Sequence, residues 1–245
     1  SAGEFSLAEK EVVAFVGGTN IGRAQEDGSL EAMLTHVFAK KEPVFRDLSW
    51  DADTVYRQSS VIERWRKNGF GDRVEQLERQ KITLVIAQFG QLESMEGKER
   101  LEDFANAYER LIDDYLKQAK QVVVVAPLAF EKPANSLLPD LTVHNPSLAL
   151  YVGKISKMAA ERKLVFVDLF TGAPRGWTGN GMHLRADAHE MAAALWMERA
   201  GLEVSPFGEI KALREAVREK NRLWFDYWRP ANWKLLYGDD SRRQF

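Results

Sequence analysis

Residues 12–20 read Val12-Val-Ala-Phe-Val-Gly-Gly-Thr-Asn20, and they give the strongest indication of the architecture. Five consecutive apolar residues, mostly β-branched or aromatic, are typical of a central strand in a parallel sheet covered on both faces. Gly17 and Gly18 permit a tight turn and a close approach to the backbone. We therefore expect Thr19 at the carboxyl end of a central strand, where open α/β sheets place their ligands.

Four further segments predict strands, and helical patterns separate them. The predicted strands are Pro43–Leu48, Ile82–Ala87, Val122–Ala126 and Val165–Leu169. Apolar residues spaced by three and four predict helices within 30–38, 99–118, 148–159, 185–199 and 209–226. Asp27 or Ser29 is expected to cap the first of these helices. The alternation of strand and helix favours parallel β-α-β units, which makes the fold class α/β.

The chain has 245 residues, enough for one large α/β domain or two small ones. The pattern favours a single domain over 1–245, with a C-terminal helix and a Trp-rich tail at about 208–245 packed on it. A surface for a protein partner is the alternative interpretation of that tail. The excursion at 131–145 carries two prolines, Pro133 and Pro139, and is expected to pass over the carboxyl edge of the sheet.

Composition narrows the function classes. The net charge of −2 gives no overall basic excess for nucleic acid or for an anionic membrane. The chain lacks cysteine, so disulfides and thiolate metal sites are excluded. No apolar run approaches the roughly 20 residues needed to span a bilayer. Gly17 and Gly18 are not followed by the Lys-Ser/Thr of a nucleotide-binding loop. We expect no cofactor and no metal.

Four segments follow strands or precede a helix at the same predicted edge. They are Gly17-Gly-Thr19, Asp47-Leu-Ser-Trp-Asp-Ala-Asp-Thr54, Phe89-Gly-Gln-Leu-Glu-Ser94 and Thr178-Gly-Asn-Gly-Met-His183. Each segment alone is a weak signal, because glycine-bounded loops with a polar residue occur in any α/β protein. Their order and separation make the combination specific.

With these four segments the chain resembles the SGNH (GDSL-type) hydrolase superfamily over most of its length. It is most similar to a bacterial subgroup, commonly predicted to be exported, whose first block reads Gly-Asn-Thr. The tail at 218–230 also resembles the end of that subgroup's domain. The resemblance implies a three-layer α/β/α sandwich with a flavodoxin-like parallel five-stranded sheet. In active relatives it implies ester or acyl-group hydrolysis without a metal.

The resemblance also assigns roles. Thr19 occupies the position of the serine nucleophile, and His183 is the retained catalytic histidine. Asn180 stands where an aspartate orients that histidine. Ala52 replaces the glycine whose N–H binds the oxyanion, and Leu92 replaces the asparagine that completes the oxyanion hole. The neighbouring positions Gly90, Glu93 and Ser94 are expected to line the site.

Two of these substitutions are expected to lower the rate, and Leu92 is expected to be more damaging than Asn180. Leu92 cannot donate a hydrogen bond, and the loss of one oxyanion donor costs roughly 3–4 kcal/mol of transition-state stabilisation in a protease. An amide at position 180 can select the wrong imidazole tautomer, which costs ~10⁴ in rate in a serine protease. A shifted loop would let Ser94 replace the lost donor. The N–H of Ala52 survives the change from glycine.

Three functional hypotheses therefore remain. The first is an esterase or acyl hydrolase acting on a small-molecule, glycan or lipid ester, with Thr19 attacking and His183 as base. The second is a catalytically silent SGNH-fold binding or interaction module. The third, a flavodoxin-like cofactor binder, shares only the topology. The subgroup implies a periplasmic or extracellular location with the signal peptide removed, while a cytoplasmic location stays open. A protein partner, the oligomeric state and the pathway are not indicated.

Plain structural interpretations stand beside these roles. Thr19 could simply cap the following helix, His183 could bond a loop carbonyl, and Glu93 could be solvated. Among the other histidines, the loop carrying His144 is expected to overhang the site. The remaining two are expected to be surface or core residues: His36 and His189.

Overall fold

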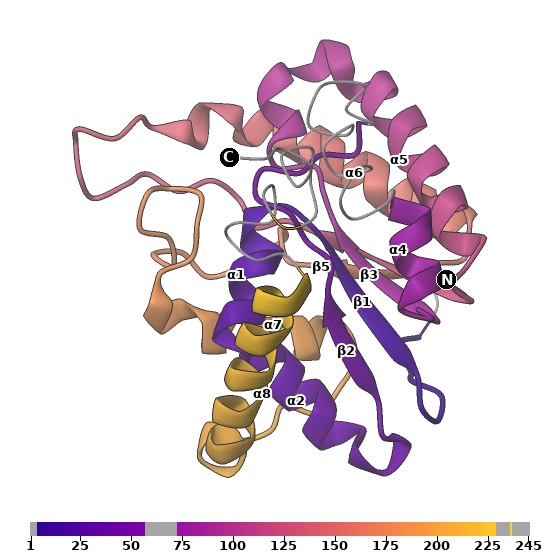
Figure 1. Cartoon of the computed structure of the whole chain (residues 1–245). Helices are drawn as coiled ribbons and strands as arrows, with labels where there is room; N and C mark the ends of the chain where they lie inside the picture. Colours follow the sequence, from indigo (N-terminus) through magenta and orange to yellow (C-terminus); the bar gives the residue numbers. More distant parts are fainter. Residues whose placement is uncertain (1–3, 57–72, 229–235, 237–245) are drawn as a thin grey trace, which may run out of the picture.

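The computed structural model describes residues 4–56, 73–228 and Leu236. In that part of the chain, five parallel strands form one sheet in the order β2-β1-β3-β4-β5 (Figure 1). The strands are β1 (Val12–Gly17), β2 (Val44–Asp47), β3 (Leu84–Gln88), β4 (Gln121–Ala126) and β5 (Val165–Asp168). The sequence predicted all five, with bounds that differ by at most two residues. The predicted α/β class and parallel five-stranded sheet are confirmed.

Helices cover both faces of the sheet and make three layers (Figure 1). One layer contains α1 (Thr19–Asp27), α2 (Ser29–Val37), α7 (His189–Arg199) and α8 (Phe207–Trp228). The opposite layer contains α4 (Arg73–Arg79), α5 (Leu101–Leu116) and α6 (Asn145–Glu161). Short 3-10 turns connect them: η1 (Ala39–Lys41), η2 (Glu93–Glu96), η3 (Lys98–Arg100), η4 (Leu141–His144) and η5 (Ala186–Ala188).

Alternate residues of β1 feed two separate cores, because successive side chains of a strand point to opposite faces. Val13 and Phe15 pack with the α1, α2, α7 and α8 layer. Ala14 and Val16 pack with the α4, α5 and α6 layer. All four are at most 6% exposed. The unbroken apolar run in the sequence is therefore explained by burial on both faces.

The turn after β1 requires glycine at its first position. Gly17 has φ = 147°, and a Cβ there would lie 2.4 Å from the carbonyl oxygen of Gln88 on β3. The chain consequently reverses into α1 without an intervening loop. Thr19 becomes the first residue of that helix, with Gly18 as the N-cap.

The expected starts of two helices are wrong. The segment after Thr19 forms two helices, and the N-cap of α2 is Gly28, with φ = 81°, rather than Asp27 or Ser29. The left-handed conformation of Gly28 ends α1 and begins α2, which a side chain would disfavour. Asp27 instead accepts the N–H of Ser29 at 3.1 Å. The helix predicted from residue 185 begins at His189, after the η5 turn.

The C-terminal helix packs on the domain, as predicted for the part up to Trp228. The indole of Trp228 is 7% exposed and donates to Oε1 of Gln76 at 3.0 Å. The indole of Trp224 donates to the carbonyl of Asp47 at 2.9 Å. The rest of the predicted tail, 229–235 and 237–245, lies outside the described residues. The assignment of 1–245 to a single domain stays a prediction.

Within 4–56 and 73–228, no helix has both the length and the apolar character needed to cross a membrane.

Candidate active site

Thr19 presents its hydroxyl at the carboxyl end of β1. The Oγ1 atom accepts a hydrogen bond from the backbone N–H of Ala52 at 3.1 Å. The side chain does not cap α1, because the N-cap is Gly18 and makes no side-chain cap bond, so the capping interpretation is wrong. The first N–H groups of a helix lack intrahelical acceptors and carry a partial positive charge. The hydroxyl therefore lies at a point that favours developing negative charge.

Ala52 lies in the loop that follows β2. Its φ of 55° is left-handed, a conformation that glycine adopts without cost and alanine adopts with strain. The loop is tied to β1 by the N–H of Trp50, which donates to the carbonyl of Gly17 at 3.0 Å. The N–H of Asp53 then closes the turn on Trp50 at 3.1 Å. These bonds hold the Ala52 N–H against the Thr19 hydroxyl.

Asn180 holds His183 through its carboxamide. Its Oδ1 accepts the backbone N–H of Met182 at 3.1 Å and that of His183 at 2.8 Å. Its Nδ2 lies 3.1 Å from Nδ1 of the His183 ring. The ring partner is thus an amide group rather than a loop carbonyl.

The two backbone donors fix which end of the Asn180 carboxamide faces the ring. An N–H needs an acceptor, so the oxygen faces the backbone and the NH₂ faces the imidazole. A neutral imidazole donates at one nitrogen and accepts at the other. We therefore assign Nδ1 of His183 as the acceptor and place the proton on Nε2. A general base that acts through Nε2 needs the other tautomer, with a lone pair on Nε2 and the proton on Nδ1.

The loop after β3 departs from the expected geometry. Glu93 is 2% exposed, so its interpretation as a solvated residue is wrong. Its carboxylate accepts the N–H of Val55 at 2.9 Å and the N–H of Gly90 at 2.8 Å. The hydroxyl of Ser94 is fully buried and donates to the carbonyl of Gln91 at 2.7 Å. The loop is not shifted in the way that would let Ser94 replace the lost donor.

Burial is the largest cause of the pKa shifts of Glu93 and His183. Burial raises the pKa of Glu93 to about 7, although hydrogen bonds from the backbone N–H groups of Glu93, Val55 and Gly90 act in the opposite direction. The pKa of His183 is lowered, first by burial and then by the positive charge of Arg23, while Asp51 opposes this. His183 is consequently neutral at pH 7, the state in which its tautomer matters.

A cavity of about 140 Å³ collects most of the predicted site residues. Those that line it are Thr19, Ala52, Gly90, Leu92, Glu93 and His183. Asn180 and Ser94 are not among its lining residues. Nor is His144, whose ring lies 6.0 Å from that of Phe130, and the expectation that its loop overhangs the site stays a prediction. His189 is a buried core residue at the start of α7.

Two carboxamides that sequence reasoning missed also line the cavity. Nδ2 of Asn20 donates to Oε1 of Gln91 at 2.9 Å and to the carbonyl of Met182 at 3.1 Å. Nε2 of Gln91 donates to the carbonyl of Leu128 at 3.0 Å. The pair links the loops after β1, β3 and β4. Each of these amides directly follows a predicted site residue in the sequence, Asn20 after Thr19 and Gln91 after Gly90. This position was the signal that could have revealed the pair.

The described part of the chain contains no group of three His, Asp or Glu side chains arranged to hold a metal ion. The cavity is also smaller than the 300–1,000 Å³ typical of cofactor and drug-sized ligand sites. Besides carboxamides and carboxylates, its lining includes the hydroxyl of Thr19, the imidazole of His183 and the backbone of Ala52, whose N–H is a donor. This set of groups suits the binding and attack of a carbonyl group.

Solved structures share this fold. A protein described as a GDSL-like lipase from Parabacteroides merdae is 17% identical and superposes with a TM-score of 0.61, covering 82% of this chain and all of its own. Axe2, an acetylxylan esterase from Geobacillus stearothermophilus, is 15% identical with a TM-score of 0.58, covering 82% of this chain and 99% of its own. No protein-family model matches the chain. No curated protein matches it by sequence.

The chain therefore has the fold of the SGNH hydrolases, as its four sequence segments indicated. The finer assignment to the exported subgroup stays a prediction. At 15–17% identity the comparison shows the fold alone. The roles proposed for individual residues are therefore argued from the geometry of the cavity.

Proposed function

We propose that the protein hydrolyses ester bonds of acyl or acetyl groups carried by a small molecule, carbohydrate or lipid. The observation that carries this proposal is the hydrogen bond from the Ala52 N–H to the Thr19 hydroxyl, inside a cavity that His183 also lines. It supports the proposal because Thr19, Ala52 and His183, the proposed nucleophile, oxyanion donor and base, line the same cavity. The acetylxylan esterase activity named for Axe2 belongs to that protein and supports the ester class by analogy alone.

The reaction would follow the two-step course of acyl transfer. Oγ1 of Thr19 attacks the ester carbonyl carbon and gives its proton to Nε2 of His183. The carbonyl oxygen becomes an oxyanion, bound by the backbone N–H groups of Thr19 and Ala52. The alcohol leaves with the proton from His183, and an acyl group remains on Thr19. Water then attacks the acyl carbon while His183 takes one of its protons. The bond to Oγ1 of Thr19 breaks, Oγ1 takes the proton back from His183, and the carboxylic acid leaves.

Two features keep this reaction slow. The first step needs a lone pair on Nε2 of His183, whereas the amide of Asn180 favours a proton there. Turning the Asn180 carboxamide over would remove the acceptor of two backbone N–H groups, and each unsatisfied group costs about 1–3 kcal/mol when buried. Leu92, which lines the cavity, adds no donor for the oxyanion. We expect turnover well below that of an enzyme with an intact set of residues.

The orientation of Asn180 also favours a second candidate function. With Nε2–H of His183 and the Ala52 N–H as donors, the cavity can bind an ester or carboxylate without attacking it. The protein would then be a catalytically silent binding module with the SGNH fold.

A periplasmic or extracellular location is part of the leading proposal, since it follows the subgroup resemblance.

Turnover of p-nitrophenyl acetate by wild type, Thr19→Ala and Thr19→Ser tests the leading proposal. We expect slow turnover in wild type, none above background in Thr19→Ala, and equal or faster turnover in Thr19→Ser because serine lacks the crowding methyl group. Unchanged turnover in Thr19→Ala would remove Thr19 as the nucleophile. An inactive wild type together with an active Thr19→Ser/Leu92→Asn double variant would favour the binding module.

A further inference from the structure

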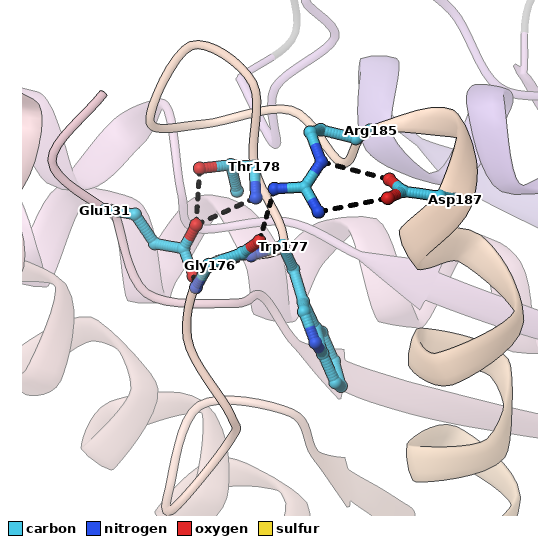
Figure 2. Close-up of polar contacts among 6 residues, drawn as sticks. All are labelled: Glu131, Gly176, Trp177, Thr178, Arg185 and Asp187. Carbon is cyan, nitrogen blue, oxygen red and sulfur yellow. Dashed lines mark hydrogen bonds and ion pairs between the residues drawn. The ribbon is translucent and has the colours of Figure 1, made fainter. Parts of the chain in front are cut away.

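The carboxylate of Glu131, which follows β4, collects four hydrogen-bond donors from one short segment (Figure 2). Oε1 accepts the N–H of Gly176 at 2.7 Å and that of Trp177 at 3.3 Å. Oε2 accepts the N–H of Thr178 at 2.8 Å and its hydroxyl at 2.6 Å. A carboxylate can accept this many bonds because each oxygen has two lone pairs. Both oxygens are therefore committed to 176–178.

The backbone of Glu131 holds the same loop at a second point. Its N–H donates to the carbonyl of Gly181 at 2.8 Å. Gly181 has φ = 84°, and a Cβ there would lie 2.3 Å from the carbonyl oxygen of Glu131. The two backbones are thus in direct contact between Asn180 and Met182, next to the residues that hold the imidazole.

Segment 176–178 is in turn bonded to His183. Thr178 pairs with Leu184 in an isolated antiparallel bridge. The N–H of Gly179 donates to the carbonyl of His183 at 3.0 Å, and the N–H of Arg185 donates to the carbonyl of Trp177 at 2.8 Å. These bonds close 177–185 into a small hairpin. A shift of its first strand therefore moves the backbone of His183.

Both ends of this connection are anchored. On the β4 side, Phe130 is fully buried, and its N–H and carbonyl both bond the side chain of Asn145, at 2.9 Å each. On the loop side, the indole of Trp177 is 7% exposed within the core. Arg185 donates to the carbonyl of Gly176 at 2.5 Å and pairs with Asp187 through two nitrogens (Figure 2). The carboxylate of Glu131 bridges two fixed parts of the molecule.

We propose that Glu131 is a positioning residue for the site: its carboxylate sets the place of the His183 imidazole through segment 176–178. Its charge fits this role. Partial burial would raise the pKa of Glu131, but the hydrogen bonds from Thr178, Trp177 and Gly176 outweigh it and lower the pKa. The carboxylate is therefore ionised at neutral pH and accepts from all four donors.

The test compares Glu131→Gln with Asp140→Asn. Glutamine keeps the size of the side chain but turns an NH₂ group toward one of the two donor sets. Asp140 is the matched control, because it lies on the same excursion and its Oδ1 accepts the N–H of Thr142 at 3.0 Å and its hydroxyl at 2.6 Å. Its substitution removes one charge from a similar cluster that is not bonded to the His183 loop.

Two readouts are needed, because the catalytic one rests on the proposed function. The first is the ¹⁵N NMR spectrum of the His183 imidazole without substrate, which needs no turnover. The second is kcat and KM for p-nitrophenyl acetate. We expect Glu131→Gln to shift or broaden the His183 signals and to lower kcat by about 10- to 100-fold, since misplacement by about 1 Å costs that much. KM is expected to stay within about twofold, and Asp140→Asn to match wild type in both readouts.

A second pair of variants separates positioning from folding. Thr178→Val removes the hydroxyl that bonds Oε2, and Thr178→Ser restores it, so the His183 signals should change in the first and return in the second. Glu131→Gln with wild-type His183 signals would overturn the proposal, including the case in which only its melting temperature falls. If wild type has no esterase activity, the proposed function fails while the NMR comparison still decides the role of Glu131.

Discussion

The amide nitrogen of Asn180 lies 3.1 Å from Nδ1 of His183, and two backbone N–H groups hold the other end of the carboxamide. This relationship sets the imidazole tautomer and hence the direction in which its outer nitrogen can move a proton. A carboxylate at position 180 would keep both backbone bonds on one oxygen and accept Nδ1–H on the other.

Asn180→Asp is therefore expected to raise kcat, because it places the lone pair of His183 on Nε2. The reverse change in a serine protease lowers kcat by ~10⁴, which sets the upper scale of the gain. Steady-state kinetics with p-nitrophenyl acetate measure it, with Thr19→Ala/Asn180→Asp as the control for background hydrolysis. An unchanged or lower kcat in Asn180→Asp would contradict the tautomer assignment.

The charge of Arg23 predicts a pH effect. Arg23 lowers the pKa of His183, after the larger contribution of burial, by disfavouring the imidazolium. Arg23→Gln should raise that pKa and move the acidic limb of the kcat/KM profile to higher pH. Asp51→Asn should move it to lower pH, because Asp51 acts in the opposite direction. The shifts should shrink at high salt, since Arg23 and Asp51 are exposed. Equal profiles for both variants at low salt would refute the prediction.

Glu93 predicts a pH-dependent stability. Its pKa is raised from 4.5 to about 7 in the folded state, so folding favours the protonated form. Its contribution is fully present below pH 4.5 and is lost as pH rises through about 7. The free energy of unfolding of wild type minus that of Glu93→Gln should therefore fall between these values, by something on the order of 3 kcal/mol. Urea unfolding at several pH values measures it, and a pH-independent difference would show that Glu93 does not titrate in this range.

Two glycine substitutions should act in opposite directions. Gly17→Ala would place a Cβ 2.4 Å from the Gln88 carbonyl at φ = 147°, so we expect a large loss of stability. Gly153 lies inside α6 with nothing within 4 Å of a Cβ, and alanine there should add roughly 0.5–1 kcal/mol. Melting temperatures of the two variants provide the comparison. A Gly17→Ala protein as stable as wild type would contradict the close approach of β1 and β3.

Sequence reasoning predicted the strands because most of them are short, mainly apolar runs bounded by turn residues, although β2 (Val44-Phe-Arg-Asp47) carries two charged residues. Of the residues expected at the carboxyl edge, Thr19, Ala52, Gly90, Leu92, Glu93 and His183 line the cavity, whereas Asn180 and Ser94 do not. Sequence reasoning did not predict the split between α1 and α2, which depends on the left-handed conformation of Gly28. Local pattern carries no information on such a dihedral when a helical periodicity continues on both sides.

Sequence reasoning also could not predict the orientation of the Asn180 carboxamide or the four hydrogen bonds to the Glu131 carboxylate. Both depend mainly on backbone N–H groups, which every residue except proline possesses and which therefore leave no pattern in the sequence. The burial of Glu93 was missed for the same reason, because its partners are the N–H groups of Val55 and Gly90. Contacts of this kind become visible only once the loops are placed in space.

The most direct test of the central claim is a search for an acyl group on Thr19. Wild-type protein mixed with p-nitrophenyl acetate is quenched with acid, digested and examined by peptide mass spectrometry. The account predicts an acetyl group on the peptide that contains Thr19, located at that residue by fragmentation and lost in Thr19→Ala. Ester turnover without an acetyl group on Thr19, at a rate that Thr19→Ala does not change, would contradict it.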